Sequence, residues 1–364
     1  MPAATGMGSN KRAGNRQTSM KLSIVDLATI QPGETATDAL AQSLDTARLA
    51  DRLGYHRIWF AEHHMAPAQA SHHPELLIAA AGMATRRIRL GSGAVLLNHY
   101  SPFKVAEMFK QLEAMFPGRI DLGLGRATAG PVIDMALRRD RQARPVDDHA
   151  AQVPETVAWL HHAFPDGHPF AGNPLIPTVA SIPDIWLLGS GESSAHIAAR
   201  LGIGYTFAGF INPQGAAAAL RAYRAHFVPT PFGPGHPRAM LGINASVGET
   251  AEEAARLVLS VKGYYNRLRQ GKFKSFVPTI AEAEQELGET ERAEPTAIVG
   301  TRWPRFVAGS PEAVRATCAE MIAQSGADEL IVQSMIANPE DRNRSYTRLA
   351  AAFGLEQAAG EAEG

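Results

Sequence analysis

The sequence predicts an α/β protein built as a (β/α)8 TIM barrel with insertions. Short apolar runs alternate with longer amphipathic stretches through most of the 364 residues. Eight strand-like runs are present, each followed by at least one helical stretch, and alternating units of this kind require a parallel sheet. No long linker divides the chain into two sheet-forming halves, so one closed barrel is favoured over an open doubly wound sheet.

The first four units are marked by helix starts and stops. Apolar residues recur at helical spacing from Leu40 to Leu53, and Gly54 ends that helix. Pro74 lies in the first turn of the next helix, where a missing N–H costs little, and Ser101 caps the third. The predicted strands are 21–27, 56–61, 88–97 and 118–125, and the predicted helices are 37–54, 73–86, 101–116, 129–142 and 148–163.

The last four units follow the same pattern, with one interruption. A polar and irregular segment, 270–308, separates the seventh unit from the eighth and reads as an insertion. Its aromatic residues Phe273, Phe276 and Trp303 suggest a lid over the barrel mouth, because long loops there often close over a site. The predicted strands are 184–189, 204–209, 239–247 and 329–335, and the predicted helices are 193–202, 213–227, 249–269, 310–326 and 339–353.

We expect a single barrel domain over 21–354, flanked by two tails. Residues 1–20 are rich in Gly, Ser, Asn, Lys and Arg and lack an apolar core, so they read as a disordered N-terminal tail rather than a secretory signal. Residues 355–364 read as a flexible C-terminal tail.

Composition excludes several classes of protein. The net charge is -1 without a basic or acidic block, which gives no footprint for nucleic-acid binding. No run of about 18 apolar residues could span a membrane. The single cysteine, Cys318, rules out an internal disulfide framework and a cysteine-based zinc site. We therefore expect a cytoplasmic protein that binds neither nucleic acid nor membrane.

Charged and imidazole side chains follow the second predicted strand. Glu62, His63 and His64 come directly after it, and His72 and His73 follow within ten residues. In a barrel this position is the catalytic face. HExxH is absent, and adjacent histidines on an extended chain point to opposite sides, so we expect no metal site. Two other interpretations of these histidines stay open. One is a metal site with two histidines and a distant carboxylate, and the other is a histidine packed as part of the scaffold.

Glycine and arginine end the next strands. Gly93 and Ala94 end the third strand within a glycine-rich run, which usually marks a close approach by a ligand or backbone. Arg126 follows the fourth strand, and its planar fork suits a phosphate. After the fifth strand a glycine-rich turn leads into a helix start, which is an anion site. The residues of this turn are Ser190, Gly191, Ser193 and Ser194. The sequence therefore predicts a phosphate pocket across strands four and five; the alternative is that Arg126 makes a surface salt bridge and the glycines only turn the chain.

At these residues the chain resembles the bacterial-luciferase-like flavin-dependent monooxygenases. The resemblance covers about 20–142, 184–247 and 307–354. The matching stretches are LSIVDL, LADRLGYHRIWFAEHH, IRLGSGAVLLNHYSPFKVAEMFKQLEAMFPGRIDLGLGR, LLGSGESS and the closing GSPEAVR, GADELIVQSMI and EDRNRSYTRLA. The two central blocks are long and specific. The resemblance implies a (β/α)8 barrel with insertions and, commonly, a homodimer.

The resemblance also assigns roles to individual residues. His63, beside Glu62, matches the histidine at the reactive edge of the flavin ring, and Gly93-Ala94 matches a non-proline cis peptide that supports the ring. Arg126 matches the phosphate-binding arginine, and Ser190, Gly191, Ser193 and Ser194 match the phosphate-binding turn. His64 and Asn98 are candidates for pocket lining. Gly125 stands where the luciferase subunit has a cysteine, which argues against light emission.

The implied activity is oxygenation of a small organic substrate with reduced FMN and O2, through a C4a-(hydro)peroxyflavin. The resemblance implies that a separate NAD(P)H flavin reductase supplies the reduced FMN. His63 is expected to move the peroxide proton near working pH. Three alternatives stay open: a deazaflavin- or FMN-dependent hydride-transfer oxidoreductase of the same barrel family, a non-catalytic flavin-binding protein, and, remotely, a metal hydrolase.

Overall fold

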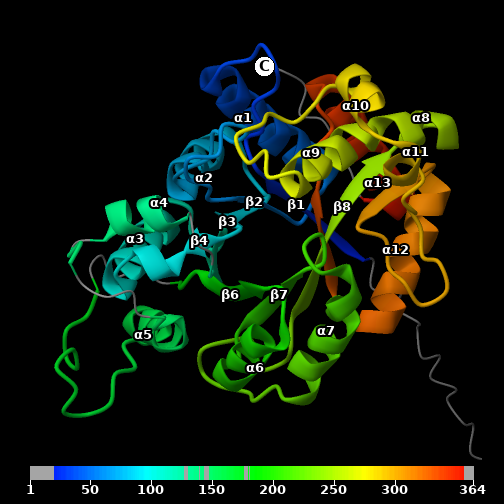
Figure 1. Cartoon of the computed structure of the whole chain (residues 1–364). Coiled ribbons are helices and arrows are strands. Elements are labelled where there is room, and N and C mark those ends of the chain that lie inside the picture. The colour runs from blue at the N-terminus through cyan, green and yellow to red at the C-terminus, as the bar shows by residue number, and fades with distance from the viewer. Residues whose placement is uncertain are drawn as a thin grey trace, which may run out of the picture.

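The chain folds into a closed parallel barrel of eight strands, as the sequence predicts (Figure 1). The computed structural model describes residues 20–126, 130–138, 140–142, 147–175, 179 and 181–355. Going round the barrel, the order is β10-β1-β2-β3-β5-β6-β7-β8, and pairing of β8 with β10 closes it. The strands are β1 (Lys21–Asp26), β2 (Arg57–Phe60), β3 (Arg89–Ser92), β5 (Ile120–Gly125), β6 (Asp184–Gly189), β7 (Gly204–Ala208), β8 (Ala239–Val247) and β10 (Glu329–Gln333).

Helices surround the barrel, and Gly54 and Pro74 lie at helix ends as predicted, whereas Ser101 precedes the third helix without a side-chain cap hydrogen bond. Thr35 and Asp38 form a capping box at the start of α1, and Gly54 ends it in a left-handed conformation. The principal helices are α1 (Ala36–Leu53), α2 (Pro74–Ala84), α3 (Pro102–Met115), α5 (His149–His161), α6 (Glu192–Leu201), α7 (Ala216–Ala225), α8 (Ala251–Leu257), α9 (Leu259–Arg269), α12 (Pro311–Ser325) and α13 (Pro339–Phe353). Within the described residues, no helix combines the length and the apolar character needed to cross a bilayer.

The third predicted strand is broken, which corrects the expectation of one strand over 88–97. β3 ends at Ser92, the Gly93–Ala94 peptide is cis as predicted, and a short β4 (Val95–Leu96) then pairs with β5. Gly91 and Gly123 are required by close backbone packing between β3 and β5. A Cβ on Gly123 would lie 2.0 Å from the carbonyl oxygen of Ser92, and one on Gly91 would lie 2.6 Å from that of Asp121.

The segment 270–308 is more ordered than its irregular sequence suggests. It contains α10 (Ile280–Glu286), α11 (Glu289–Arg292) and the start of β9 (Phe306–Gly309), which pairs with β8. Trp303 is buried and donates a hydrogen bond from Nε1 to Gln324 Oε1 at 2.7 Å, so it is a packed residue. Phe273 and Phe276 are exposed, at 69% and 38%. The proposed tails lie outside the described residues apart from Met20 and Leu355.

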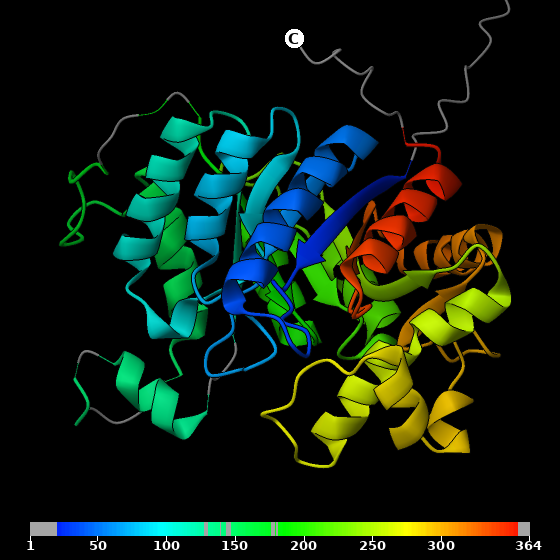
Figure 2. The ribbon, with the colours of Figure 1, turned by 90° about the horizontal axis from the view of Figure 1, so that it is seen from above.

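Two insertions lie at the carboxyl ends of the strands. Figure 2 shows α4 (Pro131–Leu137) on one side of this end and α9 with α10 on the other. The loop after β2 is attached to α9, because Gln69 Nε2 donates to the Tyr264 hydroxyl at 3.1 Å and Ala68 is buried against the same helix. The insertions therefore help to position the loop that carries the histidines.

A buried ion cluster links strands across the barrel interior. Arg57 of β2 bonds Asp121 of β5 at 2.6 Å and Glu329 of β10 at 2.8 Å. Its guanidinium lies 4.8 Å from the ring centroid of Trp186, and Trp59 Nε1 donates to Asp121 at 2.9 Å. Burial alone would raise the pKa of Asp121, but the positive charges of Arg57 and Arg89 lower it.

We predict that Arg57→Met destabilises the fold by about 3–5 kcal/mol, because it leaves two buried carboxylates without their shared cation. Urea unfolding followed by circular dichroism measures this. Arg48→Met is the control, since Arg48 forms an exposed pair with Asp45 and its loss should change stability by no more than about 0.5 kcal/mol. Equal unfolding midpoints for the two variants would contradict the prediction.

Candidate functional site

The predicted site residues all follow strands at the same end of the barrel. Glu62, His63 and His64 come after β2, Arg126 after β5, and Ser190 to Ser194 after β6. Parallel strands bring these carboxyl ends to one edge, where barrel enzymes hold their substrates. The fold therefore gathers at one mouth residues that are far apart in sequence.

Glu62 is the centre of a buried hydrogen-bond network. Its side chain is 1% exposed. One oxygen accepts from the Tyr100 hydroxyl at 2.8 Å and lies 2.7 Å from His64 Nε2, and the other accepts from the Leu96 backbone N–H at 3.0 Å. Burial and the nearby Glu62 charge raise the pKa of Tyr100. Glu62, expected to bind the cofactor, thus ties the end of β2 to β4 and to the turn after it.

His63 and His64 have different surroundings. The backbone N–H of His63 donates to Ser71 at 3.0 Å, whereas its Nδ1 atom is buried without a hydrogen-bond partner among the described residues. Burial, with the neighbouring His64 and His72, lowers the pKa of His63 to about 4. His63 is therefore a neutral imidazole at physiological pH.

His64 lies within a group of imidazole rings. Its ring centroid is 6.4 Å from that of His72, 6.0 Å from that of His73 and 6.4 Å from that of His99. No group of three or more His, Cys, Asp or Glu side chains in the described part of the chain has the arrangement of a metal site. Neither His99 nor Tyr100 was predicted to belong to the site. His99 is the last residue of the short helix η1 (Leu97–His99), and Tyr100 follows it. Only the tertiary structure brings the two residues to Glu62.

The two halves of the predicted phosphate pocket are neighbours in the sheet. Leu124 of β5 pairs with Leu187 of β6, so Arg126 and Gly189 follow at the same level on adjacent strands. Gly191 is the N-cap of α6, makes no side-chain cap, and has open space where a Cβ would stand. The first backbone N–H groups of α6 are thus free to bind an anion.

The serines of this turn do not all face outward. Ser194 Oγ donates to the Gly191 carbonyl at 2.9 Å and lies 3.2 Å from the Tyr205 hydroxyl, so it braces the turn from inside. Ser193 is exposed in the first turn of α6, and Ser190 accepts a bond from Asn212 through its carbonyl group at 3.0 Å. Ser193 and the backbone amides are the groups that could contact a phosphate.

Arg126 forms an ion pair with Asp147, a partner that the sequence did not indicate. Its guanidinium lies 2.9 Å from Asp147, and the two side chains are 60% and 59% exposed. His149, the first residue of α5, has its pKa lowered by burial and by the charge of Arg126. The surface salt bridge weighed as an alternative for Arg126 is therefore present, although an exposed pair of this kind is weak enough for a phosphate to replace it.

Further unpaired polar atoms lie close to this region. Asn98 Oδ1, Gln152 Oε1 and His149 Nδ1 are buried without hydrogen-bond partners among the described residues. Gln152 Nε2 donates to the Tyr100 carbonyl at 3.4 Å, which joins α5 to η1. Unsatisfied buried polar atoms are unusual in native folds, and a hydroxyl-rich ligand would supply the missing donors. Neither His149 nor Gln152 carries a signal in the sequence beyond its place on a predicted helix.

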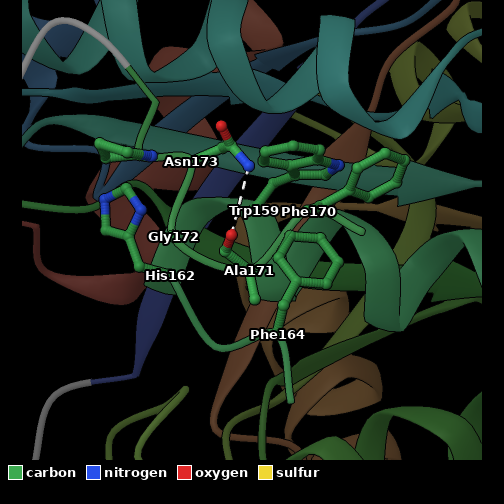
Figure 3. Close-up of a pocket in the computed structure, with 8 residues that line it drawn as sticks. Trp159, His162, Phe164, Phe170, Ala171, Gly172 and Asn173 are labelled. Carbon is green, nitrogen blue, oxygen red and sulfur yellow. Dashed lines mark hydrogen bonds between the residues drawn. The ribbon is translucent and has the colours of Figure 1, made fainter. Parts of the chain in front are cut away.

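A separate aromatic cavity lies away from these residues, in the segment between α5 and β6 (Figure 3). It has a volume of about 180 Å³. Trp159 packs edge-on against Phe164, with ring centroids 4.8 Å apart, so aromatic rings pack against one another in the wall of the cavity. The lining residues are Trp159, His162, Phe164, Phe170, Ala171, Gly172, Asn173 and Pro174.

Comparisons with known proteins agree with this architecture. The family model described as "Luciferase-like monooxygenase" matches residues 20–329. The chain is 38% identical to Bacillus subtilis YceB, covering 91% of this chain and 99% of that one. It is 34% identical to the N-acetyl-S-alkylcysteine monooxygenase of Bacillus subtilis, covering 91% and 97%. The crystal structure of apo-MsnO8 superposes with a TM-score of 0.83 at 41% identity, covering 93% and 100%.

More distant structures share the fold alone. They include the oxygenating constituent of 3,6-diketocamphane monooxygenase in complex with FMN, at 18% identity and a TM-score of 0.69 with 94% and 100% coverage. An F420-dependent secondary alcohol dehydrogenase follows at 14% identity and a TM-score of 0.60, with 92% and 99% coverage. Because the family model spans most of the chain and several relatives exceed 30% identity over nearly their full length, the protein belongs to the luciferase-like monooxygenase family.

Proposed function

We propose that this protein is a flavin-dependent monooxygenase that uses reduced FMN and O2 to oxygenate a small organic substrate. The observation that carries the proposal is the strand register that sets Arg126 beside the uncapped start of α6. An arginine fork and free helix amides together suit a phosphate monoester. Bound FMN supplies the oxygen chemistry, and the chain supplies position and a shielded mouth.

The residues of the mouth fit the parts of FMN. Arg126, Ser193 and the amides of α6 would hold the phosphate, while Asn98, His149 and Gln152 offer unpaired atoms for ribityl hydroxyls. Gly93 and Ala94 are proposed to support the ring, with His63 at its edge as a neutral imidazole. A relative named as an N-acetyl-S-alkylcysteine monooxygenase makes thioethers worth including in a substrate screen with aldehydes and ketones.

A deazaflavin-dependent hydride transfer is the second candidate, because an F420-dependent dehydrogenase shares the fold. The two functions differ in cofactor and in oxygen use. Titrating the protein separately with FMN and F420, and then measuring substrate-stimulated oxygen uptake, distinguishes them. FMN binding without substrate-stimulated uptake would instead indicate a flavin-binding protein.

We predict that Arg126→Ala weakens FMN binding by about 1–2 kcal/mol, less than the loss of a buried charge-assisted bond because solvent screens this site. Flavin fluorescence quenching measures the dissociation constant. Riboflavin, which lacks the phosphate, is the control ligand, and its affinity should not change. Equal loss of FMN and riboflavin binding would show that Arg126 does not hold the phosphate.

His63 is proposed to contact the ring edge. His63→Ala should keep the barrel and change FMN affinity by less than about tenfold, since the phosphate anchors lie elsewhere. Product formation should fall, because the ring edge loses this contact. Product and hydrogen peroxide are measured per O2 consumed, and the peroxide share should rise. Unchanged coupling would leave His63 as a scaffold residue.

We also propose a homodimer that receives reduced FMN from a separate NAD(P)H flavin reductase in the cytoplasm. Leu76 and Met83 of α2 are 68% and 79% exposed, and their spacing of two helical turns sets them on one face. Exposed apolar faces of this kind usually meet a partner.

Introducing a charge should break such a dimer. Leu76→Asp is expected to shift the protein from dimer to monomer in sedimentation experiments, because the carboxylate would lose its hydration in an apolar contact. Glu107→Asp, on the neighbouring α3, keeps its charge and serves as the control. A monomeric parent protein would refute the dimer proposal directly.

A further inference from the structure

Glu62, Tyr100 and His64 form a connected group whose geometry restricts the protonation of His64. The Glu62 carboxylate acts as acceptor toward the Tyr100 hydroxyl and the Leu96 N–H, which is the role of an ionised carboxylate. Its 2.7 Å contact with His64 Nε2 then requires a proton on that nitrogen. In neutral His64 the free lone pair therefore sits on Nδ1.

His64 and His63 differ in two features that affect proton uptake, the carboxylate partner of the ring and its exposure. A carboxylate bonded to one ring nitrogen fixes the tautomer and stabilises the imidazolium that forms when the other nitrogen takes a proton. His64 has such a carboxylate partner, and its side chain retains 11% exposure. His63 has no carboxylate partner, and its Nδ1 is buried.

We infer that His64 is the group that accepts the proton at the mouth, with Glu62 and Tyr100 as the positioning residues that orient it. This inference rests on the proposed function. The Nδ1 lone pair takes a proton from a hydroxyl group or water at the mouth: an N–H bond forms as an O–H bond breaks, and the pair of electrons stays on oxygen. The imidazolium later returns the proton to solvent, so the group is regenerated. His63 keeps a different role, as a neutral contact of the flavin ring.

Other titratable groups face the His64 ring. His72 and His73, from the loop before α2, oppose a positive charge on His64, whereas Glu62 favours it. His99 of η1 lies on the remaining side and is itself 3.6 Å from Asp134 of α4. The Glu75 carboxylate of α2 has its Oε1 atom 3.8 Å from His73 Nδ1.

The first test uses the chain without cofactor. Nitrogen chemical shifts of the His64 ring, followed by NMR against pH, report both its tautomer and the midpoint of its titration. We expect the Nε2–H tautomer. Glu62→Gln should move the midpoint to lower pH, because a carboxylate in contact favours the charged ring. Tyr100→Phe should move it up by a smaller amount, because Tyr100 no longer withdraws charge from the carboxylate.

The opposite directions of these two shifts distinguish a charge effect from a loosened fold. Glu75→Gln is the matched control, a carboxylate beside a neighbouring histidine, and it should move the midpoint less than Glu62→Gln. An Nδ1–H tautomer of His64 would overturn the inference, and so would a titration midpoint that is unchanged in Glu62→Gln. Either result would do so even if FMN bound normally.

The second test follows turnover with reduced FMN and a substrate from the screen. In the parent, kcat/KM should rise with pH through an acid limb, and Glu62→Gln should shift that limb toward lower pH. His64→Ala should remove the limb and lower turnover by about 10²–10⁴-fold. His63→Asn should leave the midpoint of the limb in place, whatever it does to the rate.

The two tests separate the inference from the proposed function. A limb that moves in His63→Asn and persists in His64→Ala would overturn the inference while the monooxygenase stood. Failure of the parent to turn over with any flavin would refute the proposed function, and the NMR measurement would then decide alone whether Glu62 controls His64.

Discussion

The ion cluster around Arg57 is the constraint on which the barrel depends. One guanidinium from β2 bonds carboxylates on β5 and β10, so three strands of the wall are joined through the interior rather than only through their backbone ladders. A cation so placed makes closure specific, because another strand order would separate Arg57 from the buried carboxylates of Asp121 and Glu329. Barrel strands otherwise present interchangeable apolar side chains, which pack in many registers. The positions of the loops at the mouth follow from the register that this cluster selects.

Close packing between β3 and β5 transmits that register to the site. Where Gly123 meets the Ser92 carbonyl there is no room for a side chain, and after Gly93 and Ala94 the chain pairs with β5 again as β4. Leu96 then offers its N–H to Glu62. The carboxylate at the end of β2 is thus held by the backbone of the next strand, and the imidazoles beside it occupy defined places. Pocket geometry here depends on strand packing as well as on contacts between the loops.

The fold was predictable from the sequence because strands and helices leave periodic patterns. All eight barrel strands lie where apolar runs occur, and helix caps such as Gly54 end the helices expected to stop there. The cis peptide at Gly93 and Ala94 was expected only from the family resemblance, and the break between β3 and β4 was not predicted, since periodicity reports neither. Residues of the site that follow strands, such as Arg126, were accessible to the same argument. Tyr100, His149 and Asp147 were not, because their importance arises from contacts between segments distant in sequence. The elements within 270–308 were missed because α10 and α11 are short and polar, and β9 has only four residues.

The exposed pair between Arg126 and Asp147 has a consequence for how a cofactor would be exchanged. A phosphate that replaces Asp147 there stays in contact with water, and each departure of the ligand is assisted by a carboxylate that returns to the same arginine. Such a site favours rapid release over long residence. Under the proposed function, a flavin bound in this way would act as a co-substrate that enters reduced and leaves oxidised in every cycle. Throughput would then depend on the concentration of reduced flavin around the protein as much as on the chemistry inside it.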